Sequence, residues 1–145
     1  YCTALSSIVI PDSVTEIEDG AFAECRALTT VVLPNSITEI SDYLFSDCTS
    51  LSDILIPASV TEIETGAFQR CTSLVSMVIP DSVTEIEDIA FSECSALRSV
   101  LLPASVTEIG VGAFDKCPNL TLTVFRNSYA ERYAQRNHIP YAYAD

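Results

Sequence analysis

Length, composition and charge narrow the class of the protein before any motif is considered. The chain has 145 residues, of which 48% are hydrophobic, so it can form one domain with a sizeable core. Its 20 Asp and Glu residues against 7 Lys and Arg residues give a net charge of -13, which opposes binding to nucleic acid and to acidic membrane surfaces. No apolar run reaches the roughly 18 residues that span a bilayer, so no membrane insertion is expected.

A 23-residue repeat organises most of the chain. Cysteines recur at this spacing from Cys2 and prolines from Pro11, with no insertion or deletion across five coils. Columns of leucine, serine and phenylalanine begin at Leu5, Ser13 and Phe22 and keep the same period. A fixed period of this length predicts a solenoid, in which stacked coils share one continuous core.

The second coil illustrates how each repeat is expected to fold. Val31 and Leu33 alternate inward at the spacing of a strand, and Pro34 ends that strand because proline cannot donate to a parallel ladder. Ile37 and Ile40 return to the core in a second extended stretch. A tight turn with apolar residues at helix-like spacing then closes the coil, through Leu44, Phe45 and Cys48.

The repeat unit resembles the BspA-like leucine-rich repeat. The third coil reads Leu51-x-x-Ile54-x-Ile56-Pro57-x-Ser59-Val60-Thr61-x-Ile63, followed by Gly66-Ala67-Phe68-x-x-Cys71. The resemblance covers residues 2–120. It implies a right-handed leucine-rich-repeat solenoid, with a parallel β-sheet on one face and short extended and helical-turn segments on the other. It also implies an extracellular or cell-surface protein that adheres to host matrix proteins or to other cells.

One position of the unit bears on backbone conformation. Gly20, Gly66 and Gly112 occupy it in three coils, whereas Tyr43 and Ile89 occupy it in the other two. Residues with a side chain rarely adopt a positive φ. We therefore expect that this position does not require one.

The C-terminal segment leaves the repeat and is expected to form a cap. We assign residues 1–120 to the solenoid, as five coils and the start of a sixth, and residues 121–145 to the cap. Ser128 and Glu131 have the spacing of a capping box, so a short helix is predicted to follow, ending at Asn137. Its apolar face is formed by Ala130, Tyr133 and Ala134, and extended structure beside the last coil is expected at Leu122, Val124 and Ile139.

No equivalent segment precedes Cys2, so the first coil is expected to present an open apolar end through Leu5, Ile8 and Ile10. Two explanations are open: further coils precede residue 1 in a longer parent protein, or this end mediates self-association. The first explanation is favoured.

The six cysteines allow two interpretations. Adjacent coils could bring Cα atoms within the roughly 4.4–6.8 Å that a disulfide needs, and a secreted chain could oxidise them. Free buried thiols are favoured, because the column lies among leucines and phenylalanines. Cys2 and Cys117, at its two ends, are expected to be the most reactive. No C-x-x-C pair occurs, so no zinc site is expected.

Glutamates form a column on another outer face. A solvated, solubilising surface is the favoured interpretation, and a calcium site is the alternative, although the chain has no D-x-[DN]-x-[DN]-G loop. We predict no metal site and no cofactor. The acidic residues concerned are Glu16, Glu39, Glu62, Glu85 and Glu108, beside Glu18, Glu64 and Glu87.

Catalysis has little support in the sequence. Cys117 and His138, the single histidine, could pair, but nothing supplies an orienting group or an oxyanion site. The recurring serines of the Ser13 column follow a proline by two residues, so hydrogen bonding to the turn backbone explains them. We predict no catalytic residues and no enzymatic activity.

The outward positions of the strands supply the candidate binding residues. An exposed apolar stripe on a solenoid marks a protein contact, whereas β-propensity alone would also place such residues there. We predict a protein-binding or adhesion module, with a structural spacer that displays another domain as the alternative. The polar column is Ser7, Thr30, Asp53, Ser76 and Ser99, and the apolar column is Val9, Val32, Leu55, Val78 and Leu101.

Overall fold

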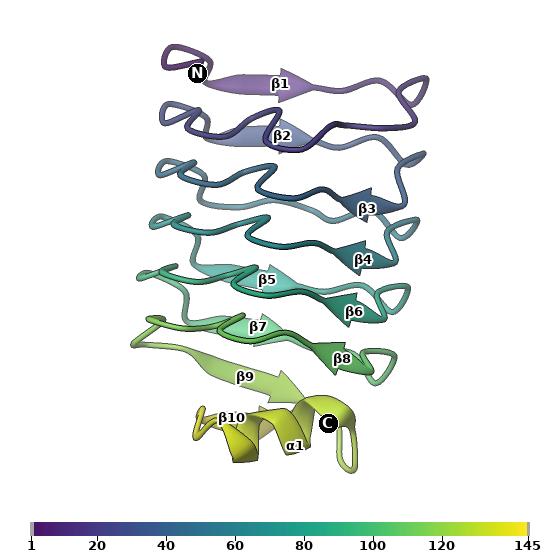
Figure 1. The fold of residues 1–145 in the computed structure, drawn as a ribbon, viewed down its shortest axis with the longest axis vertical. Helices are drawn as coiled ribbons and strands as arrows, with labels where there is room; N and C mark the ends of the chain where they lie inside the picture. The colour runs from purple at the N-terminus through teal and green to yellow at the C-terminus, as the bar shows by residue number, and fades with distance from the viewer. Residues whose placement is uncertain (1, 145) are drawn as a thin grey trace.

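The computed structural model describes residues 2–144 as a stack of coils closed by one short helix (Figure 1). Tyr1 and Asp145, the outermost residues of the predicted solenoid and cap, lie outside the described residues. The coils follow the 23-residue period, and their strands run parallel. The predicted solenoid with a parallel sheet and a C-terminal helix is confirmed.

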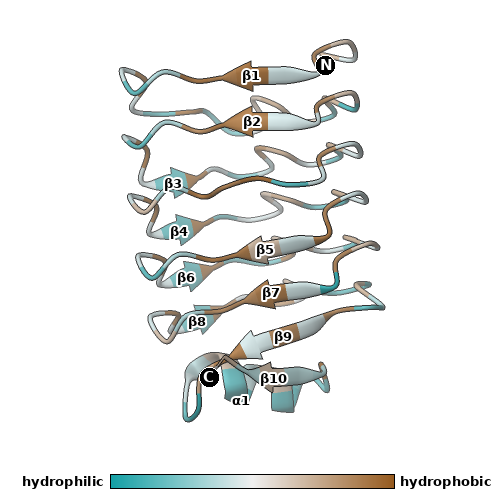
Figure 2. Ribbon diagram, turned by 180° about the vertical axis from the view of Figure 1, so that it is seen from behind, coloured by the Kyte–Doolittle hydropathy of each residue, from teal (hydrophilic) through white to brown (hydrophobic). Residues whose placement is uncertain are grey.

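Short parallel strands line one face of the solenoid, which we call the strand face (Figure 2). Its strands form a two-stranded sheet, β1-β2, and a four-stranded sheet, β10-β9-β7-β5. No strand occurs at residues 51–57, so the sheet is interrupted at the third coil. The strands are β1 (Ser7–Val9), β2 (Thr30–Val32), β5 (Ser76–Val78), β7 (Ser99–Leu101), β9 (Thr121–Val124) and β10 (Tyr141–Tyr143).

A second parallel sheet, of order β3-β4-β6-β8, runs along another face. Each of its strands is a Glu-Ile pair whose isoleucine is buried. The register aligns glutamate with glutamate from coil to coil, so we call this surface the acidic face. The strands are β3 (Glu39–Ile40), β4 (Glu62–Ile63), β6 (Glu85–Ile86) and β8 (Glu108–Ile109).

A third set of backbone hydrogen bonds, which we call the turn ladder, links the turns that close the coils. In the first coil the N–H groups of Gly20, Phe22 and Glu24 donate to carbonyls of the second coil at 2.7–3.1 Å. The residues between them, such as Ala21 and Ala23, donate to carbonyls three residues back. The pattern recurs at every step up to the fifth coil, giving twelve bonds that all point toward the C-terminus. The predicted helix-like turn is therefore a series of hydrogen-bonded turns.

The turn ladder explains why the expectation about positive φ is wrong. Tyr43 and Ile89 have φ values of 54° and 49°, close to the 62–68° of the equivalent glycines Gly20, Gly66 and Gly112. Every coil therefore has a left-handed residue at this position. In the first four coils its N–H donates to the next coil, so a shared backbone bond accompanies the conformation whatever the side chain. The left-handed conformation strains Ile89, since branching at Cβ disfavours a positive φ.

The core is a set of stacked columns, as predicted. Phe45, Phe68 and Phe91 are fully buried, and their rings stack with neighbouring centroids 5.2–5.8 Å apart. At the C-terminal end, Phe114 meets the edge of Tyr133, 6.2 Å away, so an aromatic contact joins the last coil to the cap. The core is continuous from the coils into the cap helix.

The cap contains helix α1 (Tyr129–Arg136) and strand β10. The Ser128 hydroxyl accepts a hydrogen bond from the Glu131 N–H, so the predicted N-cap is confirmed. The Glu131 carboxylate accepts from the Asn127 N–H, one residue before the N-cap, so the second bond of the predicted capping box is shifted by one position. Asn137 is the C-cap, also as predicted. Ile139 lies outside the strands, because the segment that pairs with β9 is β10, two residues further on.

The opposite end of the stack has an apolar concavity. It is lined by side chains of the first coil, among them Ile8, Val14, Ile17 and Phe22, each of which is partly exposed. In the inner coils the residues of these columns are buried by the coil before them.

Candidate binding surfaces

The structure brings all ten predicted binding residues to the strand face. In the apolar column, Val9, Val32, Leu55 and Val78 are 72%, 50%, 82% and 62% exposed, and Leu101 is partly buried. All members of the polar column are exposed. The burial pattern of β2 and β5, exposed, buried and exposed, has the predicted period of two. An aliphatic stripe therefore runs beside a polar row.

The third coil is the irregular part of this face. Asp53 and Leu55 lie in the segment that has no strand, between β2 and β5. Leu55 is also the most exposed member of the stripe, at 82%. The apolar column therefore keeps its 23-residue spacing through the third coil, although the strand pairing of the sheet is interrupted there.

The acidic face concentrates carboxylates of successive coils. Two groups have carboxylate oxygens within 4.8 Å of one another: Asp19, Asp42 and Glu64 form the first, and Glu62, Glu85 and Glu87 the second. Carboxylate oxygens at this spacing could hold a hard cation such as calcium, the alternative left open by the sequence. Several carboxylates already accept protein hydrogen bonds. The Thr65 hydroxyl donates to Glu87 at 2.9 Å, and the Thr65 N–H donates to Asp42 at 3.0 Å.

Glu64 is the carboxylate most affected by this crowding. Partial burial raises its pKa to about 7, and the negative charges of Glu39, Asp42, Glu87 and Asp19 act in the same direction. Near neutral pH a large fraction of this side chain is therefore protonated.

The thiol column lies inside the solenoid. Cys25, Cys48, Cys71 and Cys94 are buried, and all six cysteines are free in the structure. From Cys48 onward each thiol donates to the carbonyl of the phenylalanine 26 residues earlier, at 3.1–3.2 Å. Burial raises the pKa of Cys48 to about 12 and that of Cys117 to about 11, which disfavours the reactive thiolate. Cys2 is exposed.

The other residues considered for chemistry are not brought into a recognisable catalytic arrangement. His138 is exposed, with a φ of 55°, just after α1. The Cys117 thiol donates to the Phe91 carbonyl, and within residues 2–144 no hydrogen bond joins it to His138. In the serine column, Ser36 and Ser105 donate to carbonyls of the coil before them, Val14 and Val83. These hydroxyls hold neighbouring coils together, a role beyond the local turn that the sequence suggested.

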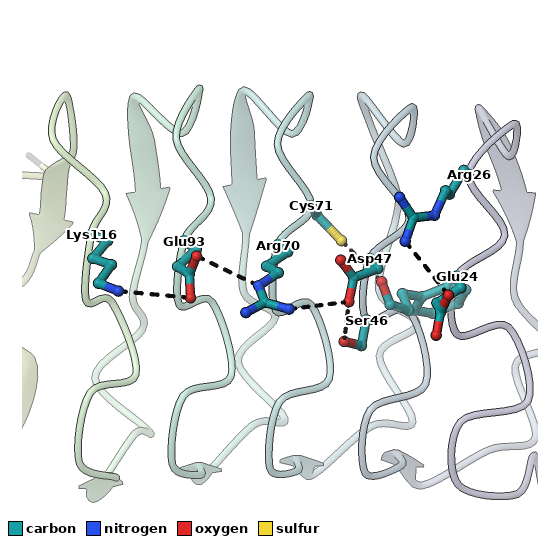
Figure 3. A network of polar contacts seen from close by, with 9 residues as sticks. Glu24, Arg26, Ser46, Asp47, Arg70, Cys71, Glu93 and Lys116 are labelled. Atoms are coloured by element: carbon teal, nitrogen blue, oxygen red, sulfur yellow. Dashed lines mark hydrogen bonds and ion pairs between the residues drawn. The ribbon is translucent and has the colours of Figure 1, made fainter.

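A column of charged residues at the turns was missed in the sequence (Figure 3). Arg70 lies between Asp47 and Glu93, with nitrogen–oxygen distances of 3.8 and 3.5 Å, and Lys116 reaches Glu93 at 3.9 Å. These four residues are 23 positions apart and their charges alternate in sign, so the 23-residue period could have revealed them. With Glu24 they share a positive φ and line the outside of the turn ladder. We call them the charge column.

Within residues 2–144, no helix is long and apolar enough to cross a membrane. The helix of the cap has 8 residues.

Comparison with solved structures gives close matches for most of the chain. A leucine rich repeat protein of T. pallidum shares 37% identity over 81% of this chain, with a TM-score of 0.78. A leucine rich cell surface protein of Faecalibacterium prausnitzii shares 36% identity over 85% of it, with a TM-score of 0.62. The pneumococcal vaccine antigen PcpA covers 97% of it at 16% identity, with a TM-score of 0.74, and supports the fold alone.

These structures are longer than the chain, which spans 57%, 40% and 42% of their respective lengths. No curated protein sequence matches it. Residues 1–121 match the BspA type leucine rich repeat region in 6 copies, so the chain belongs to the BspA-type leucine-rich-repeat family, as the resemblance of its repeat unit implied.

Proposed function

We propose that the chain is a non-enzymatic protein-binding module of a secreted or cell-surface protein, and that it binds through the strand face. The observation that carries the proposal is the aliphatic stripe of Val9, Val32, Leu55 and Val78, whose side chains are at least half exposed. Contiguous apolar surface of this kind is costly to leave in water, and in solenoids the extended face is a common contact surface. The related cell surface protein of F. prausnitzii supports the location.

The charge distribution is consistent with a contact at this face. The strand face carries Asp53 among otherwise uncharged side chains in its two columns, whereas the acidic face aligns Glu39, Glu62, Glu85 and Glu108. A protein partner therefore meets little electrostatic repulsion at the strand face and strong repulsion, unless it is basic, at the acidic face. Host matrix and cell-surface proteins are the partners suggested by the family.

A structural spacer is the second candidate function. The observation that favours it is the uniform stacking: twelve turn-ladder bonds and four stacked phenylalanine contacts repeat with little variation. A rod of this kind can display another domain without using its own surface.

A triple variant distinguishes the two functions. V32S, L55S and V78S together remove the centre of the stripe, while the control variant E39Q, E62Q and E85Q changes the same number of residues on the acidic face. Binding to purified matrix proteins, immobilised one at a time, is measured by surface plasmon resonance. The binding proposal expects a loss of at least about 10-fold for the serine variant and little change for the control.

Equal binding by the serine variant, with an unchanged circular dichroism spectrum, would exclude the strand face as the contact. No binding of the unmodified chain to any matrix protein would favour the spacer.

A further inference from the structure

The hydrogen bonds of the turn ladder all point in one direction, and the N–H groups at its C-terminal end belong to the fifth coil. All twelve bonds run from an N–H of one coil to a carbonyl of the next, so the peptide dipoles add along the stack. In a helix the same alignment leaves unpaired N–H groups and partial positive charge at one end. Here the corresponding N–H groups are those of Gly112, Phe114 and Lys116. Within residues 2–144, none of the three has a main-chain acceptor.

Gly112 occupies the left-handed position of the fifth coil, and the same position in the other four coils shows how its N–H group is used. Its φ of 68° matches the left-handed conformation of Gly20, Tyr43, Gly66 and Ile89, whose N–H groups donate across the coil interface at 2.8–3.0 Å. In those four coils this conformation directs the N–H toward the following coil, whereas among residues 2–144 the Gly112 N–H has no main-chain acceptor. On that side the chain has left the repeat, and α1 packs there instead (Figure 1).

A cavity of about 260 Å³ lies between Gly112 and the cap helix. Its wall includes Val111 and Gly112 from the coil and Tyr129, Tyr133, Arg136 and Asn137 from the cap. The space that a next coil would fill is therefore only partly taken by α1.

Three of the residues that line this cavity carry hydrogen-bond donors: Gly112 a backbone N–H, Tyr129 a hydroxyl and Arg136 a guanidinium. The Tyr129 hydroxyl accepts from the Ile109 N–H at 3.4 Å, which leaves its own proton to donate. Arg136 has no acidic partner among residues 2–144 and carries five N–H donors. The Asn137 side-chain amide already donates to the Tyr133 carbonyl. Backbone N–H, hydroxyl and guanidinium groups together are suited to an oxygen acceptor that bears negative charge.

The cap is also the part of the chain where an anion is least repelled. Residues 121–144 contain Arg126, Arg132 and Arg136 against Glu131, whereas the coils contain most of the acidic residues. One carboxylate opposes binding, because the Asp115 side chain lies beside Gly112, 3.0 Å from where a Cβ of that residue would be. Its negative charge offsets that of Arg136 and lowers the affinity for any anion.

We propose that the cavity between the last coil and α1 is a carboxylate-binding site, in which the Gly112 N–H, the Tyr129 hydroxyl and the Arg136 guanidinium bind the anion. A peptide C-terminus or an acidic side chain of a partner would supply the carboxylate. The site lies at the end of the stack and is independent of the stripe on the strand face.

The test is a titration with sodium acetate, followed by ¹H–¹⁵N NMR at ionic strength held constant with sodium chloride. The Gly112 amide is expected to shift with saturation. The Gly66 amide is the internal control, because it already donates to the Asp88 carbonyl at 3.0 Å. Equal, non-saturating shifts of Gly112 and Gly66 would overturn the proposal.

Two variants of exposed residues test the charges in opposite directions. R136Q removes the guanidinium and is expected to weaken acetate binding by roughly 10-fold, whereas D115N removes the opposing carboxylate and is expected to strengthen it. Both spectra report on folding through the unaffected amides. An unchanged midpoint for R136Q, or weaker binding by D115N, would contradict the assignment.

Discussion

The first coil and the third coil share a consensus but differ in what surrounds them. Phe22 stacks on a single ring, that of Phe45, and is partly exposed, whereas Phe68 lies fully buried between two rings at 5.5 and 5.2 Å. A Cβ added at Gly20 would meet nothing closer than 3.8 Å, while one at Gly66 would overlap with the ring of Tyr43. The energetic weight of a repeat position therefore depends on its neighbours, as expected for a solenoid.

Truncating the two phenylalanines to alanine should give the largest difference in stability between the two coils. F68A leaves a large void between two stacked rings and should lower the free energy of unfolding by roughly 3–5 kcal/mol, whereas F22A should cost about 1–2 kcal/mol because part of its ring is already in water. Denaturant titration measures both. A cost below about 1 kcal/mol for F68A would contradict the register of the core.

Replacing the left-handed glycines of the same two coils by alanine should give a smaller difference in stability. G20A and G66A share the backbone cost of positive φ, roughly 1–2 kcal/mol, but G66A also has to displace Tyr43, which adds about 1–3 kcal/mol. Measured against Y43A alone, the double variant Y43A/G66A should show the backbone cost of G66A without the second part. If G20A and G66A lowered the melting temperature equally, the ring of Tyr43 would not be in contact with Gly66.

Glu64 gives the smallest expected effect, a dependence on pH. Its folded pKa of about 7 lies above the ordinary 4.5, so the folded state binds the proton more tightly than the unfolded state. This stabilisation is present below about pH 4.5 and is lost as the pH rises to about 7. E64Q should therefore flatten the melting temperature across this range, by an effect of about 1 kcal/mol or less after solvent screening.

The control for this prediction is E18Q, which changes the same column in the first coil. It should keep the decline of melting temperature between pH 4.5 and 7 that the unmodified chain shows. A decline that persists unchanged in E64Q would mean that other carboxylates cause it.

The period of the sequence predicted which columns of side chains form the core. The inward alternation around Val31, the stacked phenylalanines and the N-cap at Ser128 all follow from side-chain type and spacing, and the structure confirms them. The division of solenoid from cap after residue 120 stays a prediction, because β9 pairs in register with β7 and carries the sheet into the cap.

Features set by the backbone could not be predicted in the same way. The left-handed conformation of Ile89 accompanies an N–H bond to the Val111 carbonyl of the next coil, and the identity of the side chain gives no sign of it. The break of the sheet at residues 51–57 falls where Asp53 stands in place of the serine or threonine of the other coils, although Ile54 and Ile56 keep the consensus. Whether the stripe binds a partner stays a prediction, since Val and Leu occupy exposed strand positions with or without one.

The alternation of large and small residues at the left-handed position sets a rule for changing the number of coils. The Tyr43 ring lies against Gly66, and Ile89 comes within 3.3 Å of where a Cβ of Gly112 would be, so each bulky residue contacts a glycine in the coil that follows it. Deleting the 23-residue coil that contains Gly66 would bring Tyr43 against Ile89, two side chains with no room for each other. Deleting or duplicating a 46-residue pair leaves the order intact. The unit that can be copied without strain at this position is the pair of coils, twice the period that the sequence displays.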